Sequence, residues 1–212
     1  NEVVEKADVV LLSVKPQFYA DVISGIKDKI RPDQIVITIA PGKKLSWLAE
    51  QFGKDVKIVR CMPNTPAMVG EGMSGVSYDE NLFTDEEKQV IDGFFTSFGK
   101  MEKVDEKLMD VVGSASGCSP AYVYMFIEAL ADGCVKNGLP RQAAYKMVAQ
   151  AVLGSAKMVL ETGKHPGELK DMVCSPGGTT IEGLAALEEN GFRGAIIKAC
   201  DANFEKNKKL KG

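Results

Sequence analysis

The sequence predicts an α/β domain with a partial parallel sheet over residues 1–105, followed by an all-helical domain over residues 106–212. Three observations support this fold class. Short β-branched apolar runs alternate with amphipathic stretches in the first half, a pattern typical of parallel strands joined by crossover helices. Three of these runs stop at or near a proline. The second half has only helical spacing of its apolar residues, and no Gly- or Ser-rich linker separates the two.

The first three predicted strands lead to a predicted ligand site. They cover residues 9–14, 35–39 and 57–62, and prolines follow at positions 16, 41 and 63. Helices are expected over residues 18–30 and 44–52, the second ending at Gly53. Open α/β sheets bind ligands beyond the carboxyl ends of their strands. If these strands are parallel neighbours, the three proline-containing loops line one crevice.

The rest of the first half completes the predicted sheet domain. A fourth strand is expected over residues 75–78 and a last strand over residues 101–104. Between them, residues 85–98 are expected to form a helix. Thr84 stands at its N-cap position and Glu87 three residues later, which is the sequence signature of a capping box.

Four main helices are expected in the second half. The first begins with Ser119 as N-cap and Pro120 behind it and ends at Asn137-Gly138. The second has its apolar stripe between Ala143 and Val159 and ends near Gly163, and the others cover residues 181–189 and 195–208. Small residues on these helices permit close helix approach and suit a homodimer of interleaved helices. Ordinary packing within a monomer is the alternative.

Composition and charge narrow the classes of function. The chain is 45% hydrophobic and 26% charged, with a formal net charge of −3. No basic block suggests a nucleic-acid partner, and no apolar run reaches the roughly 18 residues of a membrane helix. Five cysteines without a Cys-x-x-Cys pair predict neither a disulfide framework nor a metal site, and favour the reducing cytoplasm. His165, the only histidine, is expected at a loop-to-helix junction.

The segment Ser175-Pro176-Gly177-Gly178-Thr179-Thr180 is the main candidate for binding an anion. It precedes a predicted helix, and the first N–H groups of a helix lack intrahelical partners and carry partial positive charge. The alternative is a plain turn with Thr179 or Thr180 as the N-cap. In the first half, Lys15 and Asn64 are either ligand contacts or ordinary loop residues. The sequence offers no strong acid, base, nucleophile or metal set, which favours hydride transfer, because the cofactor then carries the chemistry.

Several separated motifs together resemble one known family. They lie at residues 13–16 (SVKP), 60–66 (RCMPNTP), 129–133 (ALADG), 138–140 (GLP) and 173–181 (VCSPGGTTI). In this order the chain resembles pyrroline-5-carboxylate reductase over nearly its whole length. The resemblance implies a Rossmann-type first domain and a helical dimerisation domain whose dimers can assemble further. It also implies reduction of 1-pyrroline-5-carboxylate to L-proline, the last step of proline biosynthesis, with NADPH or NADH.

The resemblance assigns roles that the spacing left open. The residues implied to line the dinucleotide are Ser13, Val14, Lys15, Pro16, Ala40, Pro41, Cys61, Met62, Pro63 and Asn64. Those implied to hold the substrate are Val173, Ser175, Gly177, Gly178, Thr179 and Thr180. Backbone N–H groups would take the substrate carboxylate. The Thr180 hydroxyl, the candidate catalytic group, would face the ring nitrogen.

The chain departs from the family pattern in two places. Ser119 stands where the family usually has glycine, and little functional change is expected from it. The Gly-x-Gly-x-x-Gly-type loop that opens family members does not precede Asn1. We therefore expect a fragment that binds the dinucleotide poorly by itself. The alternatives are a catalytically silent dimerisation module and a related two-domain dehydrogenase. The latter would need a catalytic lysine on the long helix, where Lys136 lies at the wrong end.

Overall fold

The computed structural model describes residues 2–53 and 55–209. Its contacts divide the chain into two compact units. The first unit comprises Asn1–Pro120 and Cys200–Gly212, and the second unit comprises Ala121–Ala199. The domain boundary expected near residue 105 stays a prediction. No helix in the described part of the chain is both long and apolar enough to cross a membrane.

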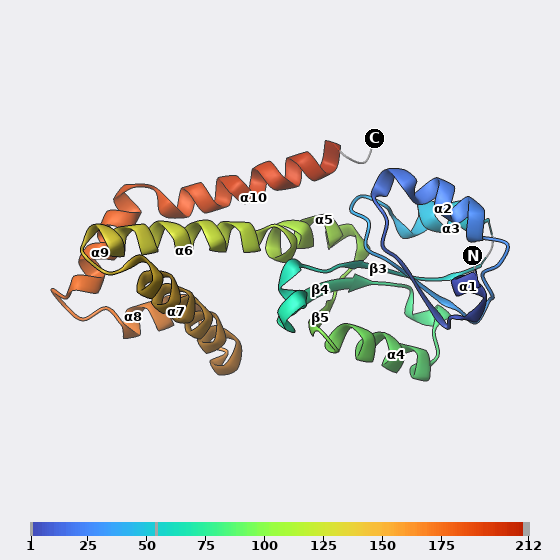
Figure 1. Cartoon of the computed structure of the whole chain (residues 1–212), viewed down its shortest axis with the longest axis horizontal. Coiled ribbons are helices and arrows are strands. Elements are labelled where there is room, and N and C mark those ends of the chain that lie inside the picture. Colours follow the sequence, from blue (N-terminus) through green and yellow to red (C-terminus); the bar gives the residue numbers. More distant parts are fainter. Residues whose placement is uncertain (1, 54, 210–212) are drawn as a thin grey trace. The chain divides into compact units, whose positions relative to one another are not determined.

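The first unit contains a mixed sheet whose strands follow the order of the sequence (Figure 1). They are β1 (Val9–Leu12), β2 (Ile35–Thr38), β3 (Lys57–Met62), β4 (Gly72–Ser77) and β5 (Gly99–Lys103). The strands β1, β2 and β3 are parallel neighbours, with Val10 beside Val36 and Val36 beside Ile58. This arrangement confirms the predicted partial parallel sheet and brings the ends of three strands to one edge.

β4 runs antiparallel to β3, although it is parallel to β5. The chain between β3 and β4 holds only a short 3₁₀ helix, η2 (Thr65–Val69). A parallel connection needs a crossover of about a dozen residues or more, usually a helix, whereas a short loop reverses the strand direction. The β3–β4 connection therefore fixes the direction of β4.

Helices cover both faces of the sheet. They are α1 (Glu2–Lys6), α2 (Tyr19–Ile26) after the 3₁₀ helix η1 (Pro16–Phe18), α3 (Leu45–Phe52) and α4 (Asp85–Thr96), the last preceded by the 3₁₀ helix η3 (Glu80–Leu82). Tyr19 of α2 and Leu48 of α3 are in one core cluster with Val36. Phe95 of α4 is in the other cluster, with Val59 of β3. Burial on both faces explains why the strands are nearly continuous apolar runs.

Two predicted helix boundaries are confirmed. The Thr84 hydroxyl accepts from Glu87 N (3.3 Å), and Glu87 Oε2 accepts from Thr84 N (2.9 Å), which completes the capping box of α4. Gly53 ends α3 in the left-handed conformation, with φ +66°. A residue without a Cβ adopts this conformation without strain.

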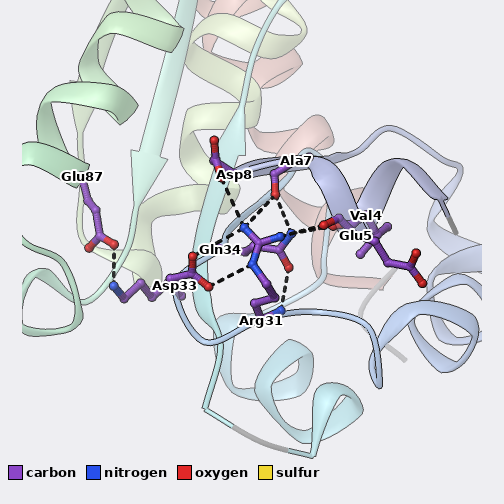
Figure 2. A network of polar contacts seen from close by, with 9 residues as sticks. Val4, Glu5, Ala7, Asp8, Arg31, Asp33, Gln34 and Glu87 are labelled. Carbon is purple, nitrogen blue, oxygen red and sulfur yellow. Dashed lines mark hydrogen bonds and ion pairs between the residues drawn. The ribbon is translucent and has the colours of Figure 1, made fainter.

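A buried amide joins α1 to the start of β2 (Figure 2). The Gln34 Nε2 atom donates to the carbonyl oxygens of Val4 and Ala7, both at 2.5 Å, and Gln34 Oε1 accepts from Arg31 N at 2.6 Å. Gln34 is fully buried. Because α1 is only five residues long, these bonds satisfy carbonyl groups that a helix end leaves without partners. The network thus fixes α1 to the sheet.

A continuous helical segment leads out of the sheet. It consists of the 3₁₀ helix η4 (Glu106–Leu108), α5 (Met109–Val112), the π-helix η5 (Gly113–Gly117) and α6 (Ser119–Lys136). The predicted N-cap at Ser119 is wrong, because the chain is already helical there. The Ser119 hydroxyl instead donates to the Ala115 carbonyl at 2.8 Å.

The second unit is helical, as predicted. Besides most of α6 it contains α7 (Arg141–Thr162), α8 (Pro166–Met172), α9 (Thr179–Glu189) and the first part of α10 (Phe192–Lys209), whose residues from Cys200 onward belong to the first unit. Its buried core is built on Ala131, Ala144 and Val148. His165 Nδ1 accepts from Gly167 N (3.0 Å) and caps α8, so the lone histidine does lie at a loop-to-helix junction.

Candidate active site

A buried tyrosine positions the loop after β1. The Tyr19 hydroxyl donates to the Leu12 carbonyl at 2.6 Å and accepts from the Thr38 hydroxyl at 3.0 Å. Tyr19 is fully buried, and burial raises the pKa of its phenol. The bond to Leu12 therefore holds the end of β1 directly before the exposed residues Ser13, Val14 and Lys15.

The loop after β2 is linked to the same tyrosine. The Thr38 hydroxyl that donates to Tyr19 also accepts from Ala40 N at 3.4 Å. Ala40 is buried and Pro41 is exposed. One chain of hydrogen bonds thus orders the ends of both β1 and β2.

At the end of β3, the two polar residues of the expected cofactor loop have different surroundings. The Cys61 side chain is only 1% exposed and belongs to the core cluster on the α4 face. Burial raises the pKa of its thiol to about 12. Asn64 is half-buried; its Nδ2 atom donates to the Ser116 carbonyl (3.1 Å), and its Oδ1 atom accepts from Met73 N (2.8 Å). Its amide therefore holds the loop, while Met62 and Pro63 are half-buried beside it.

Arg60 is a residue of this region that the sequence analysis missed. It is 2% exposed, and its guanidinium pairs with Glu106 (3.2 Å) and Asp110 (3.7 Å). Glu106 also accepts from Leu45 N (2.6 Å) in the first turn of α3. The ion pairs thus connect β3, α3 and the segment that leads to α6. A charged residue inside the apolar run of residues 57–62 was the signal that could have identified it.

These three loops fit a dinucleotide. The parallel neighbours β1, β2 and β3 end at one edge, and the loops beyond them expose Ser13, Pro41 and the cations Lys15 and Lys44. Such loops let a flat ligand approach the backbone, and a lysine can contact a phosphate. This edge brings together all the predicted cofactor residues of the first unit, with Cys61 available only through its backbone.

In the second unit, the predicted substrate residues surround the start of α9. Gly177 adopts the left-handed conformation (φ +65°), and Gly178 is the N-cap residue of α9. No side chain caps this helix, so the alternative in which Thr179 or Thr180 is the N-cap is wrong. Both threonines are exposed in the first turn, and Val173 and Ser175 are exposed before it.

The turn before α9 leaves little room for a side chain at Gly178. Gly178 N donates to the Ser175 carbonyl at 3.0 Å. A Cβ on Gly178 would lie 2.4 Å from Ser175 Oγ and 3.1 Å from Ser175 O. The first N–H groups of a helix without a side-chain cap are free to bind an anion such as a carboxylate. The start of α9 has this arrangement.

Comparisons with known proteins agree with the resemblance seen in the motifs. Residues 106–210 match the family model described as pyrroline-5-carboxylate reductase dimerisation, and residues 1–42 match the one described as NADP oxidoreductase coenzyme F420-dependent. The chain is 51% identical to a pyrroline-5-carboxylate reductase of Escherichia coli, covering 99% of this chain and 78% of the relative. It is 46% identical to one of Glycine max, covering 99% of this chain and 76% of the relative.

A solved structure extends this agreement to the fold. The pyrroline carboxylate reductase of Plasmodium falciparum, crystallised with NADP bound, matches with a TM-score of 0.90 at 37% identity. The match covers 100% of this chain and 80% of that chain. Sequence motifs, whole-chain identity and backbone geometry therefore all indicate the same family. The chain belongs to the pyrroline-5-carboxylate reductase family.

Proposed function

We propose that this protein reduces the C=N bond of 1-pyrroline-5-carboxylate to give L-proline, the last step of proline biosynthesis, with NADPH or NADH as cofactor. The observation that carries the proposal is the start of α9, where a glycine N-cap and no capping side chain leave backbone N–H groups for a carboxylate. The NADP-bound relative of Plasmodium falciparum supports the choice of cofactor.

The first unit holds the dinucleotide at the carboxyl edge of β1, β2 and β3. The residues proposed to line it are Ser13, Val14, Lys15, Pro16, Ala40, Pro41, Cys61, Met62, Pro63 and Asn64. Tyr19 and Thr38 keep the first two loops in place through their hydrogen bonds. Asn64 acts on the third loop through the Ser116 carbonyl and Met73 N.

The second unit holds the imine through the start of α9. The residues proposed to contact it are Val173, Ser175, Gly177, Gly178, Thr179 and Thr180. The N–H groups of the first turn bind the carboxylate, and the Thr180 hydroxyl faces the ring nitrogen. When bound, the reduced dinucleotide supplies the hydride. A protonated imine is already electrophilic, so these residues contribute mainly by orienting it.

The proposal also covers the oligomeric state of the protein and its location in the cell. The protein acts as a homodimer that can assemble further, supported by the match of residues 106–210 to a dimerisation model. It works in the cytoplasm, as the cysteine pattern suggests. Both properties are proposals that go with membership of this family.

The test compares two glycine-to-alanine variants of the same helix. At Gly178 the new Cβ would press on Ser175, whereas at Gly183 it would meet no atom within 4 Å. We expect Gly178→Ala to raise the KM for the imine roughly tenfold, as loss of one hydrogen bond to a charged group would. NADPH affinity should be unchanged. Gly183→Ala should change neither value.

The assay is NADPH oxidation on addition of 1-pyrroline-5-carboxylate, with L-proline binding by calorimetry as a second measurement. A full-length wild-type protein that oxidises no NADPH would overturn the proposed activity. If Gly178→Ala and Gly183→Ala have the same KM, the assignment of the carboxylate to the start of α9 is wrong.

A further inference from the structure

The end of α10 is bound to the π-helix η5 by a ladder of side-chain amides within the first unit. Asn203 Oδ1 accepts from the Ser114 hydroxyl at 2.7 Å, and Asn203 Nδ2 donates to Cys118 Sγ at 2.8 Å. One turn later, Asn207 Nδ2 donates to Asn203 Oδ1 (3.2 Å) and to the Asp110 carbonyl (3.4 Å). These contacts hold the chain on both sides of η5.

The same π-helix is bound on another side by the expected cofactor loop. The Ser116 carbonyl accepts from Asn64 Nδ2 (3.1 Å), and Asn64 Oδ1 accepts from Met73 N (2.8 Å). Ser114, held by α10, and Ser116, held by Asn64, are two residues apart in the five residues of η5. Hydrogen bonds therefore connect α10 to the loop after β3 through a single helical turn.

A π-helix is less favourable than the α-helix and persists where its surroundings hold it. If η5 relaxed to α-helical hydrogen bonding, its last residues, including Ser116, would rotate by up to one helical position, or roughly 100°. The Ser116 carbonyl would then turn away from Asn64. The position of the Ser116 carbonyl, which accepts from Asn64 Nδ2, thus depends on the contacts that keep η5 in its π form.

We propose that Asn203 is a positioning residue for the dinucleotide site. It acts through Ser114 and η5 on Asn64, and so on the loop formed by Met62 and Pro63. This inference rests on the proposed function, because that function assigns the loop to the cofactor. Asn203 itself belongs to none of the loops proposed to touch the cofactor or the substrate.

The experiment compares substitutions that remove different bonds. Asn203→Leu removes every hydrogen bond of the side chain. Asn203→Asp keeps an acceptor for Ser114 and Asn207 but loses the donor to Cys118. The control is Lys206→Ala, an exposed residue of the same helix. The measurements are the Kd for NADPH by fluorescence titration, the KM for the imine, and hydrogen exchange of the Met73 amide.

We expect Asn203→Leu to weaken NADPH binding about fivefold, the lower end of the usual range of coupling between sites. The KM for the imine should change less than twofold. The Met73 amide should exchange faster, because its acceptor Asn64 is no longer fixed. Asn203→Asp should recover most of the NADPH affinity, and Lys206→Ala should match the wild type.

A double-variant cycle distinguishes positioning from general loss of stability. If Asn203 acts through Asn64, the double variant Asn64→Ala/Asn203→Leu binds NADPH no more weakly than Asn64→Ala alone. Fully additive effects, or an equal loss of imine and NADPH affinity in Asn203→Leu, would overturn the inference. If Asn203→Leu does not fold, Asn207→Ala takes its place in the same cycle, because Asn207 Nδ2 donates to Asn203 Oδ1. A wild type that binds NADPH but does not reduce the imine contradicts the proposed function alone, since the Kd comparisons still decide the role of Asn203.

Discussion

Two neighbouring residues of β3 show how side-chain direction decides what a residue can do. Successive side chains of a strand point to opposite faces. Arg60 therefore reaches the carboxylates of Glu106 and Asp110, while Cys61 enters the core beneath α4. With its pKa raised to about 12 by burial, the Cys61 thiol stays protonated at neutral pH. It is thus a packing residue whose backbone alone can serve the cofactor loop.

The Thr180 hydroxyl carries the most specific residue-level prediction. In Thr180→Val only this hydroxyl is lost, because the N–H groups at the start of α9 remain. We expect the KM for the imine to rise about tenfold, the effect of losing one good hydrogen bond, while the Kd for NADPH stays within twofold. Steady-state kinetics and fluorescence titration measure the two values.

The matched control for this substitution is Thr96→Val, which removes a threonine hydroxyl from α4, where it donates to the Asp92 carbonyl. This variant should keep both constants. Equal losses of imine and NADPH affinity in Thr180→Val, with the fold intact, would show that Thr180 does not face the imine.

The residues proposed to touch the ligand were easier to single out from the sequence than those that support them. The loop residues Lys15, Pro41 and Asn64 stand out because they follow predicted strands. Tyr19 and Thr38 read as ordinary helix and strand residues, and their hydrogen bond exists only once β1 and β2 are adjacent. Such supporting contacts depend on tertiary structure, which local sequence patterns do not contain.

Helices and strands were likewise predicted where local residues determine them and missed where distant residues do. The capping box of α4 and the glycine end of α3 were predicted because they depend on residues within one turn. The π-helix η5 was missed, and so was the direction of β4. A π-helix has no hydrophobic period of its own that a sequence reveals, and η5 is held by residues as distant as Asn64 and Asn203. The short helix α1 was missed as well, because it spans too few turns to show a period, and of α8 only the start after His165 was predicted.

The capping box of α4 is joined to β3 by an ion pair that should make stability depend on pH. Lys57 Nζ lies 2.5 Å from Glu87 Oε1, and this hydrogen-bonded lysine lowers the pKa of Glu87 below its usual value. A lowered folded-state pKa stabilises the protein above the unfolded-state pKa of about 4.3. The stabilisation is lost as the pH falls through the lower folded-state value.

We therefore expect Glu87→Gln to unfold at lower urea concentration than the wild type at pH 7. The amide can still accept from Thr84 N, so the cap remains while the charge is lost. The difference between the two proteins should shrink as the pH falls below about 4.3 and vanish below the folded-state pKa. Urea titrations between pH 3 and pH 7 measure it.

Glu86→Gln is the control for the general effect of a negative charge near a helix start. Glu86 lies in the same turn of α4 with an exposed side chain. A difference that stays constant down to pH 3 in Glu87→Gln, or one of the same size in Glu86→Gln, would contradict a specific role for the Lys57–Glu87 pair.

The second unit has a small core and exposes large apolar side chains, so we expect it to need a partner. Among its described residues, the buried core cluster contains only Ala131, Ala144 and Val148. Large apolar side chains are instead exposed, including Met125 (72%), Met147 (62%), Leu160 (82%) and Ile197 (61%). Exposed apolar surface of this kind marks an interaction site. We expect a second copy of the chain to cover this surface, because residues 106–210 match the pyrroline-5-carboxylate reductase dimerisation model.

The dimer can be tested by placing charge on this surface. Met125 of α6 and Met147 of α7 are exposed, so the double variant Met125→Glu/Met147→Glu should keep the helical fold. In a dimer these carboxylates would have to be buried without partners, which is costly. We expect the dimer dissociation constant to rise more than tenfold, measured by sedimentation equilibrium. Lys157→Glu, an equally exposed change on α7, should dimerise as the wild type does. If the double variant dimerises equally well, these two methionines lie outside the interface, and the homodimer must form through another surface.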